Sequence, residues 1–478
     1  MSTPIDIINP RTGQADYSIV PLLPGELTTL ALRMRSAQPR WAERPIEERA
    51  AILKRLGLAI GHHREPLVTA LCADTGRIGI SRTEVDSIPA MLTRWADRAP
   101  ALITQHSVND FQTSHPSIKT DLRLVPYPLV GVISPWNFPL ILALIDAIPA
   151  LMAGCAVLVK PSEVTPRFIR PLVAALTEVP ELQDILAIVE GDGATGEALV
   201  SLVDYVAFTG SVATGRKVAE AAARAFIPAS LELGGKDPFI VLASADPQVA
   251  ARTALRASVV NTGQACQSIE RIYVAQEIAE PFITALVREA SAVQLNYPDL
   301  DQGDIGPFIF SRQAEIVQAH IDQAVAAGAK VLTGGKVETL GGGKYLRPTV
   351  LTGVTPDMDV MVQESFGPIL PVAVFGTVDE AVTLANASEF GLSGAVFAGS
   401  LEEAEAVGCQ LNVGGVSLND GSLTAIVWET EKSSFGSSGM GPSRMGDSGL
   451  LRFFRRQAIM RQHGTPLPLA AYGEGQRT

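Results

Sequence analysis

The sequence predicts an α/β protein in which parallel strands alternate with helices. Between residues 130 and 225, short apolar runs alternate with segments whose apolar residues recur at helical spacing. A second series of the same kind begins near residue 236. Continuous apolar strands separated by helices are typical of parallel sheets that are covered on both faces. Because 47% of the residues are hydrophobic and 18% are charged, the chain can bury a large core.

Length, charge and cysteine spacing narrow the class of protein. A chain of 478 residues has room for two to four domains of roughly 150 residues each. The net charge of −12 and the lack of a Lys/Arg-rich run argue against a nucleic-acid partner. The four cysteines, at positions 72, 155, 266 and 409, form no CxxC pair. We therefore expect reduced thiols, no disulfide framework and no metal site.

Neither secretion nor membrane insertion is expected. The N-terminus lacks the basic and apolar regions of a signal peptide. The longest apolar stretch, 138–160, is interrupted by proline, aspartate and glycine, so it does not read as a membrane span. We expect a cytoplasmic protein.

Periodicity predicts most of the secondary structure. The segment 120–125 alternates between polar and apolar residues and is flanked by prolines, which is typical of a strand in a small flap. The segment 433–448 is rich in glycine and serine, and we expect a long functional loop there. Helices are expected over 24–37, 47–62, 65–75, 81–99, 140–153, 166–176, 197–202, 212–225, 247–260, 279–293 and 312–327, and strands over 131–135, 156–160, 185–190, 205–210, 238–242, 271–275, 330–335, 349–354, 370–376 and 452–460.

One cysteine has the setting of a nucleophile. Cys266 lies in the stretch NTGQACQSIERIY (261–273), on a loop that leads into an apolar strand. Its small neighbours would let a carbonyl group approach the sulfur. The alternative is a cysteine that only packs, since most cysteines in soluble proteins behave as small buried hydrophobic residues.

A cysteine nucleophile needs a base, and the sequence offers a glutamate. The six histidines occur in polar or helical contexts without glycine-rich turns, so we expect them all on the surface. Glu232 lies 34 residues before Cys266 and precedes the Gly-Gly turn of LELGGK (231–236). A Cys/Glu pair favours chemistry through a hydrolysable thioester over that of a thiol protease.

Two glycine-rich turns are candidates for contact with phosphate. GDGATG (191–196) follows an apolar strand and fits GxGxxG, but the acidic residue expected about twenty positions later is absent. FTGSVATG (208–215) is a strand-to-helix turn, and a helix N-terminus can face a phosphate. Either segment could instead be a structural tight turn.

Six segments stand out along the chain: PWNFP (135–139), KPSE (160–163), FTGS (208–211), ELGGK (232–236), GQAC (263–266) and ESFGP (364–368). Together they resemble the aldehyde dehydrogenase superfamily in order and spacing. The resemblance extends over nearly the whole chain, from INP near the start to the loop SGMGPSRMG. It implies a Rossmann-type cofactor domain (1–110 and 128–234), an α/β catalytic domain (235–435) and a small β oligomerisation flap (111–127 and 450–478). It also implies a homodimer or a homotetramer, and we expect the strands at 120–125 and 452–460 to have exposed edges that pair with a partner subunit.

The resemblance implies roles for individual residues. Cys266 is similar to the nucleophile of the family, Glu232 to its general base and Asn137 to its oxyanion-hole amide. Lys160 and Glu163 resemble the contacts to the adenosine ribose. The other implied cofactor contacts, around the pyrophosphate and the nicotinamide, are Trp136, Ser162, Gly193, Gly210, Ser211, Gly215, Leu233, Glu364 and Phe366.

Elementary chemistry agrees with these roles. Attack of a thiolate on an aldehyde creates an oxyanion, which the Asn137 amide and the backbone N–H of Cys266 can stabilise by roughly 3–4 kcal/mol per donor. Loss of hydride to the cofactor leaves a thioester, and Glu232 can activate the water that releases the acid. We expect NAD to be preferred over NADP, because Glu163 can accept hydrogen bonds from ribose hydroxyls but repels a 2′-phosphate.

The loop near the C-terminus favours an apolar or aromatic aldehyde as the small-molecule substrate. Trp428 and Phe435 lie in the segment 417–440, which contains no arginine, and Arg444 lies beyond it. A semialdehyde dehydrogenase, whose substrate carries a carboxylate, is the alternative. Transfer of the acyl group to coenzyme A is less consistent with Glu232, and a catalytically idle binding protein is less consistent with the complete Cys/Glu/Asn set.

Overall fold

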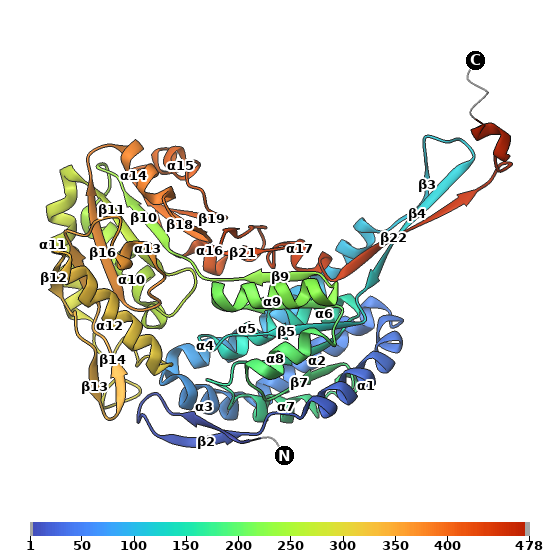
Figure 1. Cartoon of the computed structure of the whole chain (residues 1–478), viewed down its shortest axis with the longest axis horizontal. Helices are drawn as coiled ribbons and strands as arrows, with labels where there is room; N and C mark the ends of the chain where they lie inside the picture. The colour runs from blue at the N-terminus through green and yellow to red at the C-terminus, as the bar shows by residue number, and fades with distance from the viewer. Residues whose placement is uncertain (1–2, 474–478) are drawn as a thin grey trace.

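A computed structural model describes residues 3–473 and contains three larger sheets (Figure 1). The first has six strands in the order β21-β9-β8-β5-β6-β7, and the second has seven in the order β12-β15-β16-β11-β10-β18-β19. The third has three strands, β22-β4-β3. The predicted α/β class with parallel strands is therefore confirmed.

The first sheet is parallel except for one short strand at its edge. Its strands are β21 (Gly439–Met440), β9 (Ala229–Glu232), β8 (Tyr205–Thr209), β5 (Leu129–Ile133), β6 (Ala156–Lys160) and β7 (Leu186–Ile188). Its helices are α1 (Pro24–Ala42), α2 (Ile46–His62), α3 (Arg64–Thr75), α4 (Ile78–His106), α5 (Pro139–Leu144), α6 (Ala147–Ala153), α7 (Ile169–Leu176), α8 (Gly193–Val200) and α9 (Val212–Ala225).

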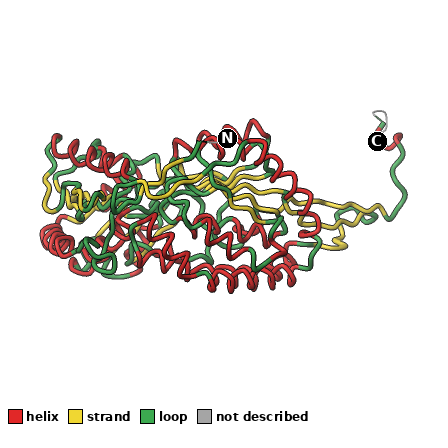
Figure 2. Tube along the Cα trace, turned by 90° about the horizontal axis from the view of Figure 1, so that it is seen from below, coloured by secondary structure: helices red, strands yellow, loops and turns green. Residues whose placement is uncertain are grey.

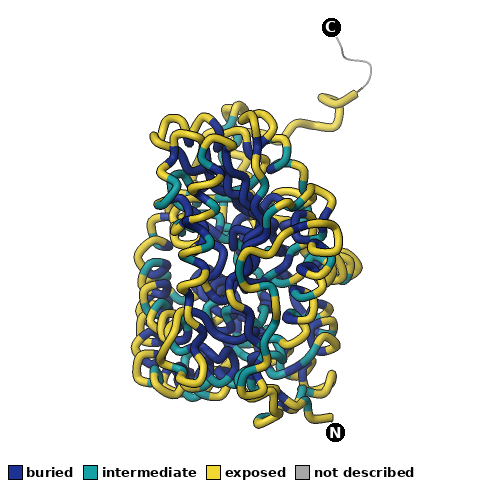
Figure 3. Tube along the Cα trace, turned by 90° about the vertical axis from the view of Figure 1, so that its left-hand side faces the viewer, coloured by how far each residue is buried: buried dark blue, intermediate teal, exposed yellow. Residues whose placement is uncertain are grey.

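Helices cover both faces of this sheet, which explains why its central strand β5 is apolar throughout. Val130 and Val132 of β5 face a core built with α2, α4 and α6, whereas Leu129 and Ile133 face a core built with α1, α8 and α9. Alternate side chains of a strand point to opposite faces, so a strand covered twice must be apolar at every position. Figure 3 shows buried residues running through the interior and exposed residues on the outer surfaces.

The second sheet is parallel except at its β12 edge, where β12 pairs antiparallel with β15. The expected division at 234/235 falls between β9, which ends at Glu232, and β10, which begins at Asp237. The strands are β12 (Lys330–Thr333), β15 (Thr349–Thr352), β16 (Ile369–Phe375), β11 (Ile269–Ala275), β10 (Asp237–Val241), β18 (Ser393–Phe397) and β19 (Gly415–Leu418). The helices after β10 are α10 (Pro247–Val259), α11 (Ala279–Ala292), α12 (Ser311–Ala326), α13 (Asp359–Val362), α14 (Val378–Asn386), α15 (Leu401–Gly408), α16 (Leu423–Ile426) and α17 (Ser448–Leu451).

The third sheet projects away from the rest of the chain, as Figures 1 and 2 both show. Its strands are β3 (Val108–Gln112), β4 (Ile118–Pro126) and β22 (Phe454–Gln462). The expectation that 120–125 has an unpaired edge is wrong, because β4 is the central strand and pairs on both sides. The free edges belong to β3 and β22. Three two-stranded sheets complete the fold: β1 (Ile5–Ile8) with β2 (Ala15–Ile19), β13 (Glu338–Leu340) with β14 (Gly343–Tyr345), and β17 (Phe390–Gly391) with β20 (Phe435–Gly436).

Two predicted segments are divided into shorter elements in the structure, and the bounds of several others are shifted. The helix expected over 140–153 is divided into α5 and α6, with Asp146 between them. The expected loop 433–448 contains the short strands β20 and β21, and β21 pairs antiparallel with β9. Such long-range pairings leave no periodic signal in a two-residue strand. None of the helices within residues 3–473 is long and apolar enough to cross a membrane.

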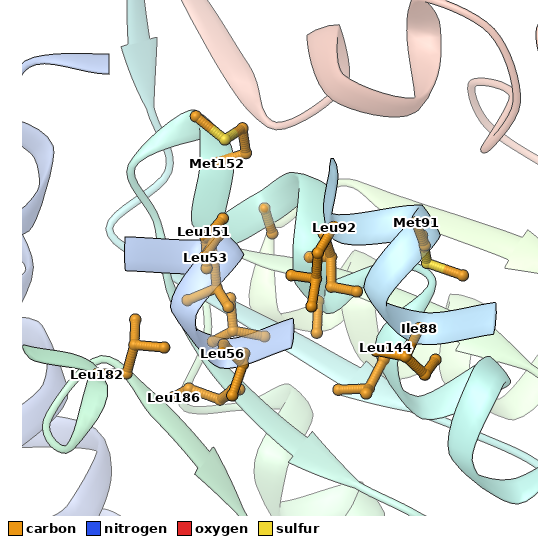
Figure 4. Packing of buried hydrophobic residues seen from close by; sticks show 14 of the residues in the cluster. Leu53, Leu56, Ile88, Met91, Leu92, Leu144, Leu151, Met152, Leu182 and Leu186 are labelled. Atoms are coloured by element: carbon orange, nitrogen blue, oxygen red, sulfur yellow. The ribbon is translucent and has the colours of Figure 1, made fainter. Parts of the chain in front are cut away.

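The helical core predicts a testable difference between two leucines of α2. Figure 4 shows Leu53 packed with leucines of α4 and α6, and its side chain is fully buried, whereas Leu58 on the opposite face is 66% exposed. Replacing a buried leucine by alanine removes apolar contact and leaves a cavity. We expect Leu53→Ala to lower the free energy of unfolding by about 2–5 kcal/mol, and Leu58→Ala to change it by less than about 0.5 kcal/mol. Chemical denaturation measures both, and equal losses would contradict the packing.

Candidate active site

A strained turn fixes the loop that carries Cys266. Three successive residues have left-handed backbone angles: Asn261 (φ 60°), Thr262 (φ 60°) and Gly263 (φ 69°). Such angles are costly for residues other than glycine, and for the β-branched Thr262 above all, so they persist only where the surroundings enforce them. A Cβ atom on Gly263 would lie 2.4 Å from the backbone of Gly367, so only glycine fits there. Cys266 follows this turn and precedes β11.

Hydrogen bonds tie Asn137 to the same loop. The Asn137 side-chain amide donates to the carbonyl of Gln264 (3.0 Å), and the Asn261 amide donates to the carbonyl of Asn137 (3.1 Å). Gln264 is itself buried and accepts a hydrogen bond from the backbone N–H of Ile309 (3.0 Å). These contacts hold the Asn137 amide beside the cysteine loop, the position that an oxyanion donor requires.

Two cavities meet at Cys266. The first, of about 280 Å³, contains Asn137, and the second, of about 380 Å³, contains Glu232. Cys266 lines both, together with Leu142, Thr209 and Leu233. A group bound in the first cavity and a group bound in the second would therefore both reach the sulfur.

The second cavity combines an apolar wall with charged groups. The apolar wall includes Phe138, Ile141, Leu142, Ile145, Trp428 and Met445. Glu232, at the end of β9, accepts a hydrogen bond from the Ser434 hydroxyl (3.0 Å), and the Nε atom of Arg444 lies 3.9 Å from its other oxygen. The Lys432 ammonium also lines this cavity and donates to Gln267 Oε1 and to the carbonyl of Thr424, both at 2.8 Å.

Burial and neighbouring charges act in opposite directions on the thiol. Burial raises the pKa of Cys266 to about 11, and the carboxyl groups of Glu364 and Glu232 add to this effect. The cations of Lys432 and Arg444 lower the pKa of the thiol. Burial also lowers the pKa of the Lys432 ammonium, because a charged group is poorly solvated there. The two cations thus favour the thiolate in a site that otherwise disfavours it.

A helix N-terminus and glycine residues form part of the wall of the first cavity. Gly210 and Ser211 line it at the start of α9, where the Ser211 hydroxyl caps the helix by accepting from the N–H of Thr214. Backbone N–H groups at a helix N-terminus favour a phosphate. A Cβ atom on Gly234 would lie 2.4 Å from Glu364 Oε2, so only glycine lets the backbone approach this carboxyl group so closely.

A buried ion pair supports another part of the wall of the first cavity. Lys236 donates to Glu270 (2.6 Å), and Glu270 accepts the backbone N–H groups of Ser365 (2.7 Å) and Phe366 (2.8 Å). Phe366 has a left-handed backbone (φ 56°) and its ring meets the Trp136 ring edge-on, with centroids 5.4 Å apart. These contacts place the two aromatic rings in the cavity wall.

Glu364 lies in the same wall, and its carboxyl group is an unusually weak acid. Burial raises its pKa to about 8, although it accepts a hydrogen bond from the backbone N–H of Gly235 (3.0 Å). A carboxyl group that is partly protonated near neutral pH can donate as well as accept a hydrogen bond.

Lys160 and Glu163 lie at the end of β6, outside the lining of both cavities. Lys160 is buried and donates to the carbonyls of Pro161 and Gly191, both at 2.9 Å, and to Glu163 (3.4 Å). Burial lowers the pKa of the Lys160 ammonium. The side chain of Glu163 is 40% exposed and therefore accessible to a ligand.

The other expected contacts are distributed unevenly. Ser162, Gly193 and Gly215 line neither cavity; Gly193 begins α8, whose cap is Asp192, and Gly215 packs beside Leu233. Phe435 also lies outside both linings, because β20 directs its backbone into pairing with β17. Its expected place beside Trp428 in the substrate pocket is thus not what the structure shows. The expected residues that do line a cavity are Trp136, Asn137, Gly210, Ser211, Glu232, Leu233, Cys266, Glu364, Phe366 and Trp428.

Sequence reasoning did not place three polar residues beside Glu232 and Cys266, and it put one buried histidine on the surface. Lys432, Ser434 and Arg444 surround Glu232 and Cys266, and only the basic character of Lys432 in the segment 417–440 could have pointed to it. His320 is buried, contrary to the surface position expected, and its ring nitrogen lies 3.2 Å from the Ser365 hydroxyl. Its helical spacing from the buried Val317 and Ala324 was the available signal.

Comparisons with known proteins agree with this geometry. A model of the aldehyde dehydrogenase family matches residues 1–459, and the chain belongs to that family. It is 38% identical, over 89% of its length and 83% of the relative's, to a Mycolicibacterium smegmatis protein named "Putative succinate-semialdehyde dehydrogenase (NADP+)". The protein is therefore an oxidoreductase that acts on aldehydes.

Solved structures show the same fold. A structure described as "Putative Aldehyde Dehydrogenase PutA" from Anabaena variabilis superposes with a TM-score of 0.95 and is 53% identical, covering 98% of this chain and 99% of that one. Betaine aldehyde dehydrogenase from Staphylococcus aureus, solved in complex with NAD+, has a TM-score of 0.90 at 28% identity, covering 97% of this chain and 93% of that one.

The raised pKa of Cys266 predicts how its alkylation depends on pH. Below the pKa, the thiolate fraction rises about tenfold per pH unit. In the absence of cofactor, we expect the rate of iodoacetamide labelling at Cys266 to keep rising up to about pH 11. Lys432→Met should slow labelling at any pH below that, because the thiolate loses a nearby cation. Mass spectrometry of the Cys266 peptide separates it from the exposed Cys409. A rate that levels off below pH 8 would contradict this description of the thiol.

Proposed function

We propose that this protein oxidises an aldehyde to the carboxylic acid with Cys266 as nucleophile, Glu232 as general base and NAD as the preferred cofactor. One observation carries the proposal. Cys266 lies where two cavities join, with the Asn137 amide on one side and the Glu232 carboxylate on the other. That arrangement separates a cofactor space from a substrate space and gives both access to one sulfur.

Attack by the thiolate is the first step. The sulfur bonds to the aldehyde carbon, and the carbonyl oxygen becomes an oxyanion that the Asn137 amide and the backbone N–H of Cys266 stabilise. Lys432 and Arg444 support this step because their charges favour the thiolate. A nicotinamide ring held in the first cavity by Trp136 and Phe366 would accept the hydride that leaves the substrate carbon.

Release of the acid is the work of Glu232. Its carboxylate faces the second cavity and takes a proton from water, the oxygen of which bonds to the thioester carbon. The carbon–sulfur bond then breaks, which frees the carboxylic acid and restores the thiolate. The Ser434 hydroxyl, which donates to Glu232, limits how far the carboxylate can turn.

Glu232→Gln tests whether Glu232 acts in acid release and not in hydride transfer. Because the amide cannot take a proton from water, hydride transfer should continue once per site while acid release slows. Stopped-flow absorbance should show a burst of NADH about equal to the sites, followed by a steady rate lowered by roughly 100-fold. Cys266→Ala is the control and should show neither phase. Loss of the burst in Glu232→Gln would assign the glutamate to the first half of the reaction.

The cofactor preference rests on Glu163. Its carboxylate is partly exposed and held by Lys160, so it can accept hydrogen bonds from ribose hydroxyls and would repel a 2′-phosphate. The proximity of the Lys160 ammonium weakens that repulsion. The relative from M. smegmatis carries NADP+ in its name, whereas the structure from S. aureus was solved with NAD+.

We expect wild type to prefer NAD over NADP by roughly ten- to a hundredfold in kcat/KM. Glu163→Gln removes the negative charge and should bring the ratio within about threefold. Glu197→Gln, on the exposed side of α8, is a matched control that should leave the ratio unchanged. Equal use of the two cofactors by wild type would show that Glu163 does not select between them.

The substrate we propose has an apolar or aromatic body, because apolar side chains form one wall of the second cavity. A second candidate is a semialdehyde with a carboxylate. Lys432 supports it, since its hydrogen bonds within the described part of the chain go to neutral acceptors, Gln267 and the carbonyl of Thr424. An ammonium without a carboxylate partner in a partly dry cavity attracts an anion.

The labelling rates of two thiol reagents distinguish these candidates without knowledge of the substrate. If Lys432 binds a substrate carboxylate, it should also favour labelling of Cys266 by anionic iodoacetate over labelling by neutral iodoacetamide. Lys432→Met should then lower the ratio of the iodoacetate rate to the iodoacetamide rate about tenfold. If the site takes an apolar aldehyde, the substitution should change both rates by the same factor. Lys336→Met, at a distant surface position, is the control.

Assembly and domain roles complete the proposal. We assign cofactor binding to the first sheet, the nucleophile to the second and oligomerisation to the flap of β3, β4 and β22. The flap has exposed strands and free edges at β3 and β22, which would be covered in a homodimer or homotetramer.

A further inference from the structure

Arg444 has an unfilled hydrogen-bonding capacity directed at the region of Glu232. Its side chain is only 9% exposed, and one end of the guanidinium is occupied, since Nη2 donates to Asp146 (3.1 Å) and to the Thr209 hydroxyl. The Nε atom is buried and has no hydrogen-bond partner within residues 3–473. Glu232 Oε1 lies 3.9 Å from it, too far for a hydrogen bond but within the range of an ion pair.

The pairing of β21 with β9 explains how Arg444 arrives there. Gly439 pairs with Glu232, so the segments on either side of β21 pass close to the carboxylate. Ser434, before β21, donates to one carboxylate oxygen, and Arg444, after β21, faces the other. Glu232 is thus bracketed by two donors from a single loop.

The net charge around Arg444 favours its contact with Glu232. Asp146 is shared by two buried guanidinium groups, Arg444 and Arg452, so the cluster carries one positive charge more than its own carboxylate neutralises. Arg452 is fully buried and reaches Asp146 without contacting Glu232. Glu232 therefore supplies the anion that the cluster lacks.

We propose that Arg444 is a positioning residue for the general base: its Nε–H closes onto Glu232 and holds the carboxylate in the orientation that activates water for thioester hydrolysis. The proposal rests on the role of Glu232 proposed above. Closure needs a movement of about 1 Å, from 3.9 Å to a hydrogen-bond distance. Arg444 does not contact the reacting carbon in this arrangement, and in thioester hydrolysis it acts through Glu232.

A cofactor-free reaction tests this directly. p-Nitrophenyl acetate would acetylate the Cys266 thiolate with loss of p-nitrophenolate, and water would then hydrolyse the acetyl thioester to acetate. Arg444→Lys keeps the positive charge that favours the thiolate but loses the Nε–H. We expect acylation to change by less than about threefold and decay of the acetyl-enzyme, followed by mass spectrometry, to slow about tenfold. Asp146 keeps its partner Arg452, which supports folding of the variant.

Arg452→Lys is the matched control, because it alters the same cluster without touching Glu232. We expect it to leave decay of the acetyl-enzyme within twofold of wild type. In a double-mutant cycle, Arg444→Lys should not slow the Glu232→Gln enzyme further, because both substitutions act on one group. Ser434→Ala removes the other contact that orients Glu232. It should also slow decay of the acetyl-enzyme more than acylation.

The outcomes distinguish failure of the proposed base, Glu232, from failure of the positioning role of Arg444. If Glu232→Gln deacylates at the wild-type rate, the proposed base is wrong and the role of Arg444 falls with it. If Glu232→Gln is slow but Arg444→Lys matches wild type, or slows both steps equally, only the positioning role is overturned. A further, multiplicative loss in the double variant would also overturn it.

Discussion

The carboxylate of Glu270 joins the three segments on which the site depends. It lies on β11, just after the cysteine loop. It accepts hydrogen bonds from the ammonium of Lys236 and from the backbone N–H groups of Ser365 and Phe366. Lys236 follows the Gly-Gly turn after Glu232, and Ser365 follows Glu364. Removing one partner of a buried ion pair leaves the other charge uncompensated, which costs about 3–5 kcal/mol. The relative positions of Cys266, Glu232 and the wall of the first cavity therefore depend on one buried ionic contact.

The site brings groups together at an electrostatic cost. Cys266 is only partly exposed, and desolvation raises the pKa of its thiol, which the acidic neighbours Glu232 and Glu364 raise further. Lys432 and Arg444 offset part of this cost, but Lys432 is itself partly desolvated. Arg444 is stabilised by Asp146, two residues beyond α5, the helix that follows the PWNFP segment. The segment that carries Asn137, the proposed oxyanion donor, thus also leads to the counterion that keeps a cation next to Glu232.

Much of the fold follows from periodicity, and the chemistry follows from the motifs. The strands β5, β6 and β8 are apolar except for Lys160 and Thr209 at the ends of β6 and β8, because helices bury both faces, and that pattern is visible in the sequence. The short strand β21 is not, since two residues carry no period, and its pairing with β9 is decided by tertiary contacts. Without that pairing there was no reason to place Arg444 beside Glu232. Phe435 was assigned to the pocket by proximity in sequence to Trp428, yet strand pairing at β20 takes it elsewhere.

The charges around Glu232 also suggest when its contact with Arg444 matters. When Cys266 reacts as the thiolate, its sulfur and the carboxylate of Glu232 both lie in the field of Lys432 and Arg444. In the proposed thioester the sulfur is neutral, so the carboxylate is left as the principal anion of the second cavity. The unpaired Nε–H of Arg444 then has Glu232 as its nearest anionic acceptor. On this reasoning the positioning contact tightens only after acylation, at the step for which an oriented base is needed.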